Sequence, residues 1–257
     1  MLTNMASVQE LNLIFKKKEL MRDRIQEILH KILDPIVRFF IAINLTPNII
    51  TTIGLILNIV VAVIFIVGAE KGSRTDLSYI GWAGAMILFA GVFDMIDGQV
   101  ARHGKMSSRF GALYDSVLDR YSELIMFLGI CYYLVSNHYF FSSLIVFIAL
   151  IGSIMVSYTR ARAESLGIPC KEGLMQRPER VITIGLSAVA CGITGFYRGG
   201  NVKWDINVLE YNGVETIVVF TIPLAIIAIL ANYTAILRLI ACYKYLQNID
   251  KTDTTIK

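Results

Sequence analysis

Long apolar runs separated by short polar segments dominate the chain from about residue 49 onward. A helix needs roughly 20 residues to cross about 30 Å of hydrocarbon. Six runs approach or exceed this length: residues 49–68, 79–101, 111–135, 139–162, 179–196 and 214–240. This pattern predicts an all-α integral membrane protein with six transmembrane helices.

The N-terminal region has a different pattern. Apolar residues recur at near-helical spacing between Leu11 and Ile32, with Lys and Arg residues between them. This is typical of an amphipathic interfacial helix on an anionic membrane surface, although a solvated helix packed on the bundle would also fit. We expect an amphipathic juxtamembrane segment over 1–46, a six-helix domain over 47–242 and a cytoplasmic tail over 243–257.

The composition supports a membrane protein. Hydrophobic residues make up 55% of the chain and charged residues 17%, against about 25% charged in soluble domains. The mean hydropathy is +0.61. These values argue against a disordered chain or a soluble nucleic-acid-binding protein, so we expect no nucleic-acid partner. The four cysteines lack CxxC or secreted-scaffold spacing, which predicts isolated thiols.

The positions of the basic residues predict an orientation. Lys71, Arg74, Arg198 and Lys203 fall in the loops expected on one side of the membrane. Most of the 24 Lys and Arg residues fall in the segments expected on the other side. Because cytoplasmic segments are enriched in Lys and Arg, we expect both termini and the loops over 102–110 and 160–180 to face the cytoplasm, with the protein in the plasma (inner) membrane.

Four carboxylates interrupt the facing ends of the second and third apolar runs. They are Asp94, Asp97, Asp115 and Asp119. A charge inside a spanning helix costs at least ~2.5–3.5 kcal/mol, so such residues are rare and usually functional. The spacing of three or four residues puts each pair on one helix face. An antiparallel hairpin would bring both pairs to matched depths, provided that the two faces point at one another.

Adjacent negative charges in a low-dielectric setting require protons or cations. Oxygen ligands suit Mg²⁺, Mn²⁺ or Ca²⁺ and disfavour zinc, and His30, His103 and His138 are too dispersed to form a nitrogen site. Four carboxylates suffice for two ions, and Mg²⁺ keeps positions open for substrate phosphates. We therefore expect two divalent cations, Mg²⁺ first and Mn²⁺ second, and phosphate chemistry.

These residues also carry a resemblance. The pattern Asp94-x-x-Asp97-Gly98-x-x-Ala101-Arg102, followed by Gly111-x-x-x-Asp115-x-x-x-Asp119, resembles the signature of CDP-alcohol phosphotransferases at every fixed position. The resemblance extends from Pro47 to about Arg238. It implies a homodimeric enzyme with six spans. Such an enzyme transfers a phosphatidyl or related group from a CDP-linked lipid to an alcohol and releases CMP.

The resemblance also implies residue roles. Asp94, Asp97 and Asp115 would ligate the metals, and Asp119 would both ligate and act as general base. The contacts with the CDP-linked lipid would come from Asn48, Thr51, Gly98, Arg102 and Ser108. The planar fork of an arginine side chain suits phosphate oxygens, which fits the role implied for Arg102.

Basic residues in the second half of the chain bear on the acceptor alcohol. They lie at predicted helix ends on the side where the Asp cluster opens. A cationic pocket there suggests a phosphorylated alcohol, and the arrangement resembles the phosphatidylinositol-phosphate synthase branch, whose acceptor is inositol phosphate. The resemblance implies that the acceptor phosphate is held by Ser157, Arg160, Arg180 and Arg238. Arg160 is preferred over Arg162 because it lies on the helix face of Ser157.

Alternatives remain open from the sequence. The arginines, including Arg162 and Arg177, could anchor the chain to lipid headgroups. Gln176-Arg177-Pro178 also departs from the acidic-basic pair expected there. Glycerol phosphate is a second candidate acceptor, which would make phosphatidylglycerophosphate. A cation transporter could use intramembrane Asp residues, although these lie near one face and no inverted repeat is evident. A structural protein could pair them with Arg102, Arg109 and Arg120.

Overall fold

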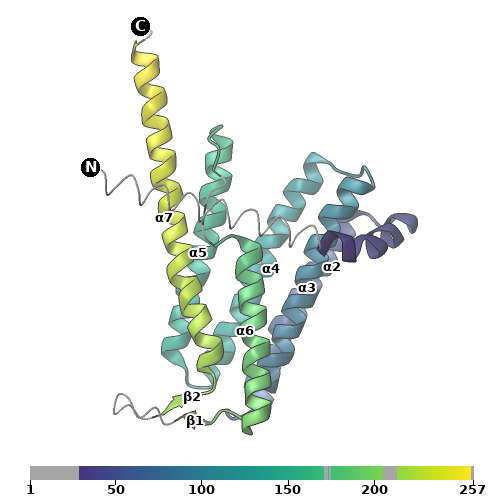
Figure 1. Ribbon diagram of the computed structural model, residues 1–257, viewed down its shortest axis with the longest axis vertical. Helices are drawn as coiled ribbons and strands as arrows, with labels where there is room; N and C mark the ends of the chain where they lie inside the picture. The colour runs from purple at the N-terminus through teal and green to yellow at the C-terminus, as the bar shows by residue number, and fades with distance from the viewer. Residues whose placement is uncertain (1–28, 171–172, 174, 205–212, 256–257) are drawn as a thin grey trace.

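The computed structural model describes residues 29–170, 173, 175–204 and 213–255. Six long helices correspond to the six predicted ranges, and they run side by side as a bundle (Figure 1). They are α2 (Pro47–Lys71), α3 (Ser78–His103), α4 (Arg109–Ser136), α5 (Phe140–Ser165), α6 (Arg177–Arg198) and α7 (Val218–Thr255). The prediction of a helical bundle is confirmed.

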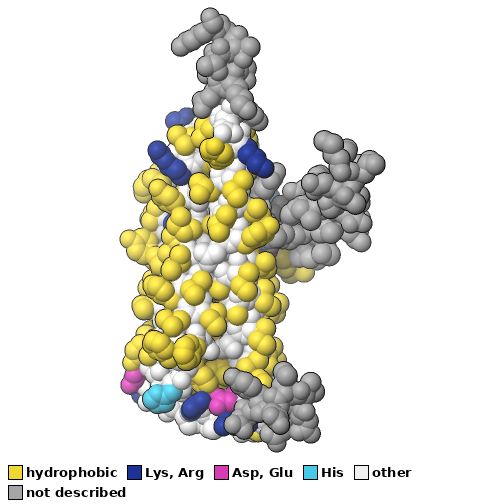
Figure 2. Space-filling view, turned by 90° about the vertical axis from the view of Figure 1, so that its left-hand side faces the viewer, with side chains coloured by type: hydrophobic (Ala, Val, Ile, Leu, Met, Phe, Trp, Pro, Cys, Tyr) yellow, Lys and Arg dark blue, Asp and Glu magenta, His cyan; other side chains and the backbone are white. Residues whose placement is uncertain are grey.

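Five of the six helices are long and apolar enough to cross a membrane. The exception is α4, which has 28 residues but carries five charged side chains: Arg109, Asp115, Asp119, Arg120 and Glu123. The prediction of six spans is therefore not confirmed, because the composition of α4 does not by itself identify a membrane span. Apolar side chains cover the middle of the face in Figure 2, and charged side chains gather toward its two ends. These features are those of an integral membrane protein with multiple spans.

A helix over residues 29–42 precedes α2 and lies at one side of the bundle, crosswise to the long helices (Figure 1). Its Leu33 and Val37 are buried in a cluster with Ile50 and Ile96. Other large apolar side chains of this segment are exposed: Ile32, Ile36, Phe39 and Ile43. The helix therefore packs on the bundle and still presents apolar groups to its surroundings. The part of the expected amphipathic segment before residue 29 lies outside the described residues.

Two further details differ from the sequence prediction. The expected all-α fold also contains a small antiparallel pair, β1 (Lys203–Trp204) with β2 (Val214–Glu215). Two-residue strands are too short to give an alternating hydrophobic signal. In addition, α7 passes residue 242 without a break and ends at Thr255, so the expected tail begins inside a helix.

Helix packing determines where the Asp residues lie. The helix α2 packs against both α3 and α4, α3 packs against α6, and α5 packs against α7. The central core includes Phe65 of α2 and Phe220 of α7, whose rings stack with centroids 6.2 Å apart. Since α3 and α4 both pack on α2, their carboxylates lie near one another, and α6, which packs on α3, reaches them with its first turn. We call this the carboxylate end of the bundle, and the end with β1 and β2 the hairpin end.

Candidate active site

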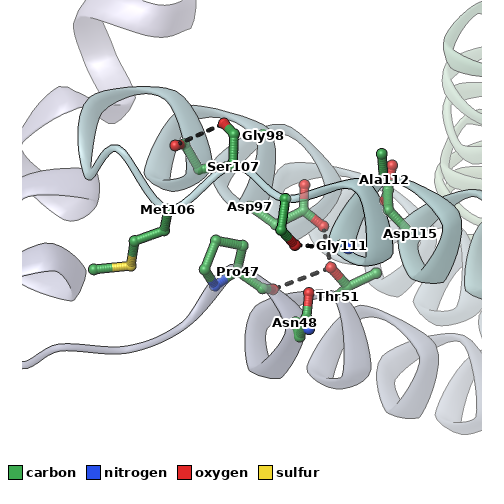
Figure 3. Close-up of a pocket in the computed structure, with 12 residues that line it drawn as sticks. Pro47, Asn48, Thr51, Asp97, Gly98, Met106, Ser107, Gly111, Ala112 and Asp115 are labelled. Atoms are coloured by element: carbon green, nitrogen blue, oxygen red, sulfur yellow. Dashed lines mark hydrogen bonds between the residues drawn. The ribbon is translucent and has the colours of Figure 1, made fainter.

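A pocket of about 140 Å³ opens between the start of α2, the last turns of α3 and the start of α4 (Figure 3). Its lining includes four of the five residues expected to contact the CDP-linked lipid: Asn48, Thr51, Gly98 and Ser108. Asp97 and Asp115 line the same pocket. The fifth, Arg102, is exposed one turn beyond Gly98, where a Cβ atom on Gly98 would lie 3.6 Å from the Arg102 Nη1 atom.

Local contacts explain how the pocket is built. Thr51 Oγ1 lies 2.8 Å from Asp97 Oδ2 and 3.0 Å from the Pro47 carbonyl oxygen, so this hydroxyl joins α2 to α3. Ser108 caps α4, and its Oγ accepts a hydrogen bond of 2.9 Å from the Gly111 backbone N–H. A Cβ atom on Gly111 would lie only 3.0 Å from Ser108 Oγ and 3.3 Å from Asn48 Oδ1. A glycine at position 111 therefore allows these polar groups to approach the helix backbone.

The other two Asp residues are joined by an arginine. Arg177, the first residue of α6, places Nη2 2.8 Å from Asp94 Oδ2 and Nη1 2.9 Å from Asp119 Oδ2. From the sequence, Arg177 could have been either a pocket residue or an anchor to lipid headgroups. The structure places it among the Asp side chains. By contrast, Arg120, which the structural-protein alternative paired with the Asp cluster, donates to the carbonyl and hydroxyl oxygens of Ser116.

The four carboxylates share one region without meeting at one point. Asp97 is buried, and the other three are half-buried. Asp94, Asp97 and Asp115 each lie near enough to Asp119 to repel its charge. A Cβ atom on Gly54 would lie 3.1 Å from Asp94 Oδ1, so a glycine in α2 lets this carboxylate approach. Within the described ranges, no three His, Cys, Asp or Glu side chains converge closely enough to hold a metal ion.

The donor set nevertheless fits a hard divalent cation. The clustered side chains are all carboxylates, which supply the oxygen ligands that Mg²⁺ and Mn²⁺ prefer. The guanidinium of Arg177 already places one positive charge between Asp94 and Asp119. Since four carboxylates share this single arginine, the region carries an excess of negative charge that a divalent cation would offset.

A second ion pair lies one turn further along α4 and α6. Arg180 donates from Nε and Nη2 to the two Glu123 oxygens at 2.8 and 3.1 Å, and from Nη1 to the Met175 carbonyl at 2.9 Å. Its side chain is fully buried. The expected placement of Arg180 at an open acceptor pocket therefore conflicts with its burial. Sequence analysis missed Glu123, although its position four residues after Asp119 puts it on the same helix face.

The remaining acceptor candidates gather between α5 and α7. Arg238 is buried and donates from Nη1 to the Val156 carbonyl at 2.7 Å, which places it beside half-buried Ser157. Arg160 is exposed and pairs with Glu164 at 2.9 Å. Arg160 and Arg180 both lie near enough to Arg238 to repel its charge. The expected basic residues are thus brought together, although Arg180 is engaged with Glu123.

Comparison with known proteins decides the family. The model of the CDP-alcohol phosphatidyltransferase family matches residues 44–243. The chain belongs to this family. It is therefore a membrane enzyme of phospholipid biosynthesis, which excludes the transporter and structural-protein alternatives as its main activity. The match covers all six long helices up to residue 243 of α7.

Two of the similar proteins are named as synthases of inositol phosphate lipids. The phosphatidylinositol phosphate synthase of Corynebacterium glutamicum is 32% identical over 166 residues, which cover 64% of this chain and 70% of the relative. The archaetidylinositol phosphate synthase of Methanothermobacter thermautotrophicus is 42% identical over 106 residues, or 41% of this chain and 52% of the relative.

A solved structure supports the fold. The Mycobacterium tuberculosis phosphatidylinositol phosphate synthase with CDP-DAG bound superposes with a TM-score of 0.63 at 24% identity. The match covers 83% of this chain and 94% of that one. Another structure of the same tuberculosis enzyme contains manganese and citrate and gives a TM-score of 0.62.

Proposed function

We propose that this enzyme transfers a diacylglycerol-phosphate or archaeol-phosphate group from a CDP-linked lipid to inositol phosphate and releases CMP. The observation that carries the proposal is the pocket that joins the expected nucleotide contacts to Asp97 and Asp115. The basic cluster around Arg238 favours an acceptor that bears its own phosphate. The phosphatidylinositol phosphate and archaetidylinositol phosphate synthases among the relatives support the same acceptor.

The CDP group would occupy the pocket at the start of α2. Asn48, Thr51 and Ser108 offer polar side chains along its wall, and Gly98 leaves room for a close approach. Arg102 stands at the edge of this wall with a planar fork that can bind two phosphate oxygens. The lipid tails would then extend along the apolar surface of the bundle.

Asp94, Asp97, Asp115 and Asp119 would hold two divalent cations, Mg²⁺ or Mn²⁺. When bound, these cations would supply the positive charge that stabilises the departing CMP. Asp119 would take the proton from the acceptor hydroxyl as general base. The resulting oxygen would attack the phosphorus on the lipid side, and the bond from that phosphorus to CMP would break. Manganese in the tuberculosis relative supports the choice of cation.

The acceptor phosphate would lie near Ser157, Arg160 and Arg238. Arg160 is exposed and can exchange Glu164 for a phosphate. Arg180 belongs to the same basic cluster, but its guanidinium is bound to Glu123. Arg180 would therefore hold α6 against α4 and would not bind the phosphate directly. Glycerol phosphate remains the second candidate acceptor, because it presents the same phosphate chemistry to these side chains.

We further propose that the carboxylate end faces the cytoplasm, and that the enzyme is a homodimer in its membrane. The orientation rests on the excess of Lys and Arg in the segments at that end. The homodimer rests on the family resemblance.

A CMP-release screen tests the reaction. The purified enzyme would receive CDP-diacylglycerol or CDP-archaeol with inositol phosphate, glycerol phosphate, free inositol, choline or serine. We expect release with inositol phosphate and little with the unphosphorylated alcohols, because these leave the basic cluster without its counter-charge. Release with glycerol phosphate alone would replace the proposed acceptor. Release with serine or choline alone would contradict a phosphate-binding acceptor site.

A further inference from the structure

Two arginines in the first turn of α6 pair with two carboxylates on one face of α4. The two pairs, Arg177 with Asp119 and Arg180 with Glu123, differ in kind. Arg180 is fully buried and binds both oxygens of a single carboxylate. The Arg177 side chain is 21% exposed and divides its two terminal nitrogens between carboxylates on different helices. Among the residues that the structure describes, none forms a hydrogen bond with the buried Arg177 Nε.

The guanidinium of Arg177 stands where a cation ligated by Asp94 and Asp119 would compete with it. It engages Oδ2 of both residues at 2.8 and 2.9 Å. A divalent cation can take these two oxygen atoms only after the guanidinium has left them. One positive charge between two carboxylates lowers their mutual repulsion, so the cluster tolerates the absence of cations.

The backbone that carries Arg177 is held in place. In the first turn of α6, Gln176 and Glu179 form a capping box, and Arg180 is fixed to Glu123. Further along α6, a Cβ atom on Gly192 would lie 2.5 Å from the Gly81 Cα atom, so α3 and α6 are in backbone contact. Exchange at the carboxylates therefore needs only rotation of the long, partly exposed Arg177 side chain.

We propose that Arg177 is an exchangeable internal counter-charge of the active site. It holds Asp94 and Asp119 in the cation-free enzyme and releases both when divalent cations bind. The affinity of the enzyme for cations is then set partly by this competition. The inference rests on the proposed function, because it requires Asp94 and Asp119 to be cation ligands.

Manganese binding without substrates tests the competition. Free Mn²⁺ would be measured by electron paramagnetic resonance during titration of the detergent-purified protein. Arg177→Gln should lower the Kd for Mn²⁺ by about tenfold, because the carboxylates lose a bound charge that opposes the cation. Arg177→Lys should lower it by a smaller factor, since an ammonium keeps the charge and loses the fork. Arg162→Gln, which removes the same charge from an exposed position on α5, should leave the Kd unchanged.

A second set of variants separates this inference from the proposed metal site. Asp115→Asn should weaken Mn²⁺ binding with either residue at position 177. If it has no effect, Mn²⁺ binds elsewhere and the proposed metal site itself fails. If Asp115→Asn weakens binding while Arg177→Gln leaves the Kd unchanged or raises it, the counter-charge role is wrong. If a thermal unfolding assay shows that Arg177→Gln does not fold, the Kd for Mn²⁺ of Arg177→Lys is used instead. A lower Kd would support the counter-charge role, and an unchanged or higher Kd would contradict it.

Discussion

The two ends of the bundle each hold a cluster of charged and polar side chains. The clusters differ in how completely their negative charge is balanced by positive charge and hydrogen-bond donors. At the hairpin end, Glu215 accepts hydrogen bonds from Arg74 at 3.1 and 3.3 Å and from Asn201 at 2.9 Å. Tyr139 donates a further hydrogen bond to Glu215. At the carboxylate end, four Asp side chains share the charge of Arg177 and the hydroxyl of Thr51.

The hairpin-end cluster has the features of a structural joint. One carboxylate meets one arginine and two neutral donors. These groups join the α2–α3 loop, the residue before α5, the loop after α6 and β2. The carboxylate-end cluster has more negative than positive charge and borders a pocket. Natural proteins leave charge unbalanced mainly where a substrate or cation balances it. The balance of charge therefore distinguishes a structural cluster at the hairpin end from a reaction site at the carboxylate end.

Removal of divalent cations should have the largest effect. A chelator should abolish CMP release, because four carboxylates would then be left with one arginine at the site of phosphoryl transfer. Added Mg²⁺ or Mn²⁺ should restore the activity, measured as CMP released per minute. Undiminished turnover in the chelator would mean that the excess charge at this end has no role in the reaction.

Asp119→Asn should lower turnover by about a thousandfold, because the variant loses the general base and a cation ligand together. The same exchange at the hairpin end provides the control. Asp76 Oδ1 accepts a hydrogen bond of 2.9 Å from the Ser78 backbone N–H, and Asp76→Asn should leave turnover nearly unchanged. Equal losses of turnover in the two variants would mean that the carboxylate end is no more important for the reaction than the hairpin end.

Arg238→Lys should raise the KM for the acceptor by about tenfold while changing the KM for the CDP-linked lipid much less. Lysine keeps the positive charge but cannot reproduce the planar fork beside Ser157. Initial rates with each substrate varied in turn measure the two constants. An increase confined to the lipid KM would place Arg238 at the nucleotide pocket.

Glu215→Gln should have the smallest effect, and it should change stability without changing either KM. Burial alone would raise the pKa of Glu215, but the hydrogen bonds from Tyr139 and Asn201 and the charge of Arg74 lower its pKa below the usual value. A lowered pKa stabilises the folded enzyme above the unfolded-state pKa of about 4.3. Near neutral pH we expect a loss of about 1 kcal/mol after solvent screening.

Thermal unfolding at several pH values measures this loss. The difference between wild type and Glu215→Gln should shrink as the pH falls through the lowered pKa, because the wild-type carboxyl then becomes neutral as well. A difference that stays constant down to low pH would mean that the charge of Glu215 contributes nothing to the joint.

The helices and the Asp motif of this protein could be predicted because they depend on the order of residues within short stretches of the sequence. Apolar runs gave the six helices to within a few residues at most ends, and the spacing from Asp94 to Asp119 gave the family. The family resemblance in turn implied four contact residues that line one pocket with Asp97 and Asp115. Periodicity and spacing fix which side chains share a helix face, and this needs no knowledge of the neighbouring helices.

The partners of the buried charges were decided only by the tertiary structure. Arg180 and Glu123 are 57 residues apart in the sequence, and Arg177 could have faced lipid headgroups as well as the Asp cluster. Which of these contacts forms depends on how α3 and α4 rest on α2 and how α6 is rotated against α3. A sequence records the charge of each side chain, whereas the depth and rotation of packed helices decide which opposite charge lies within reach.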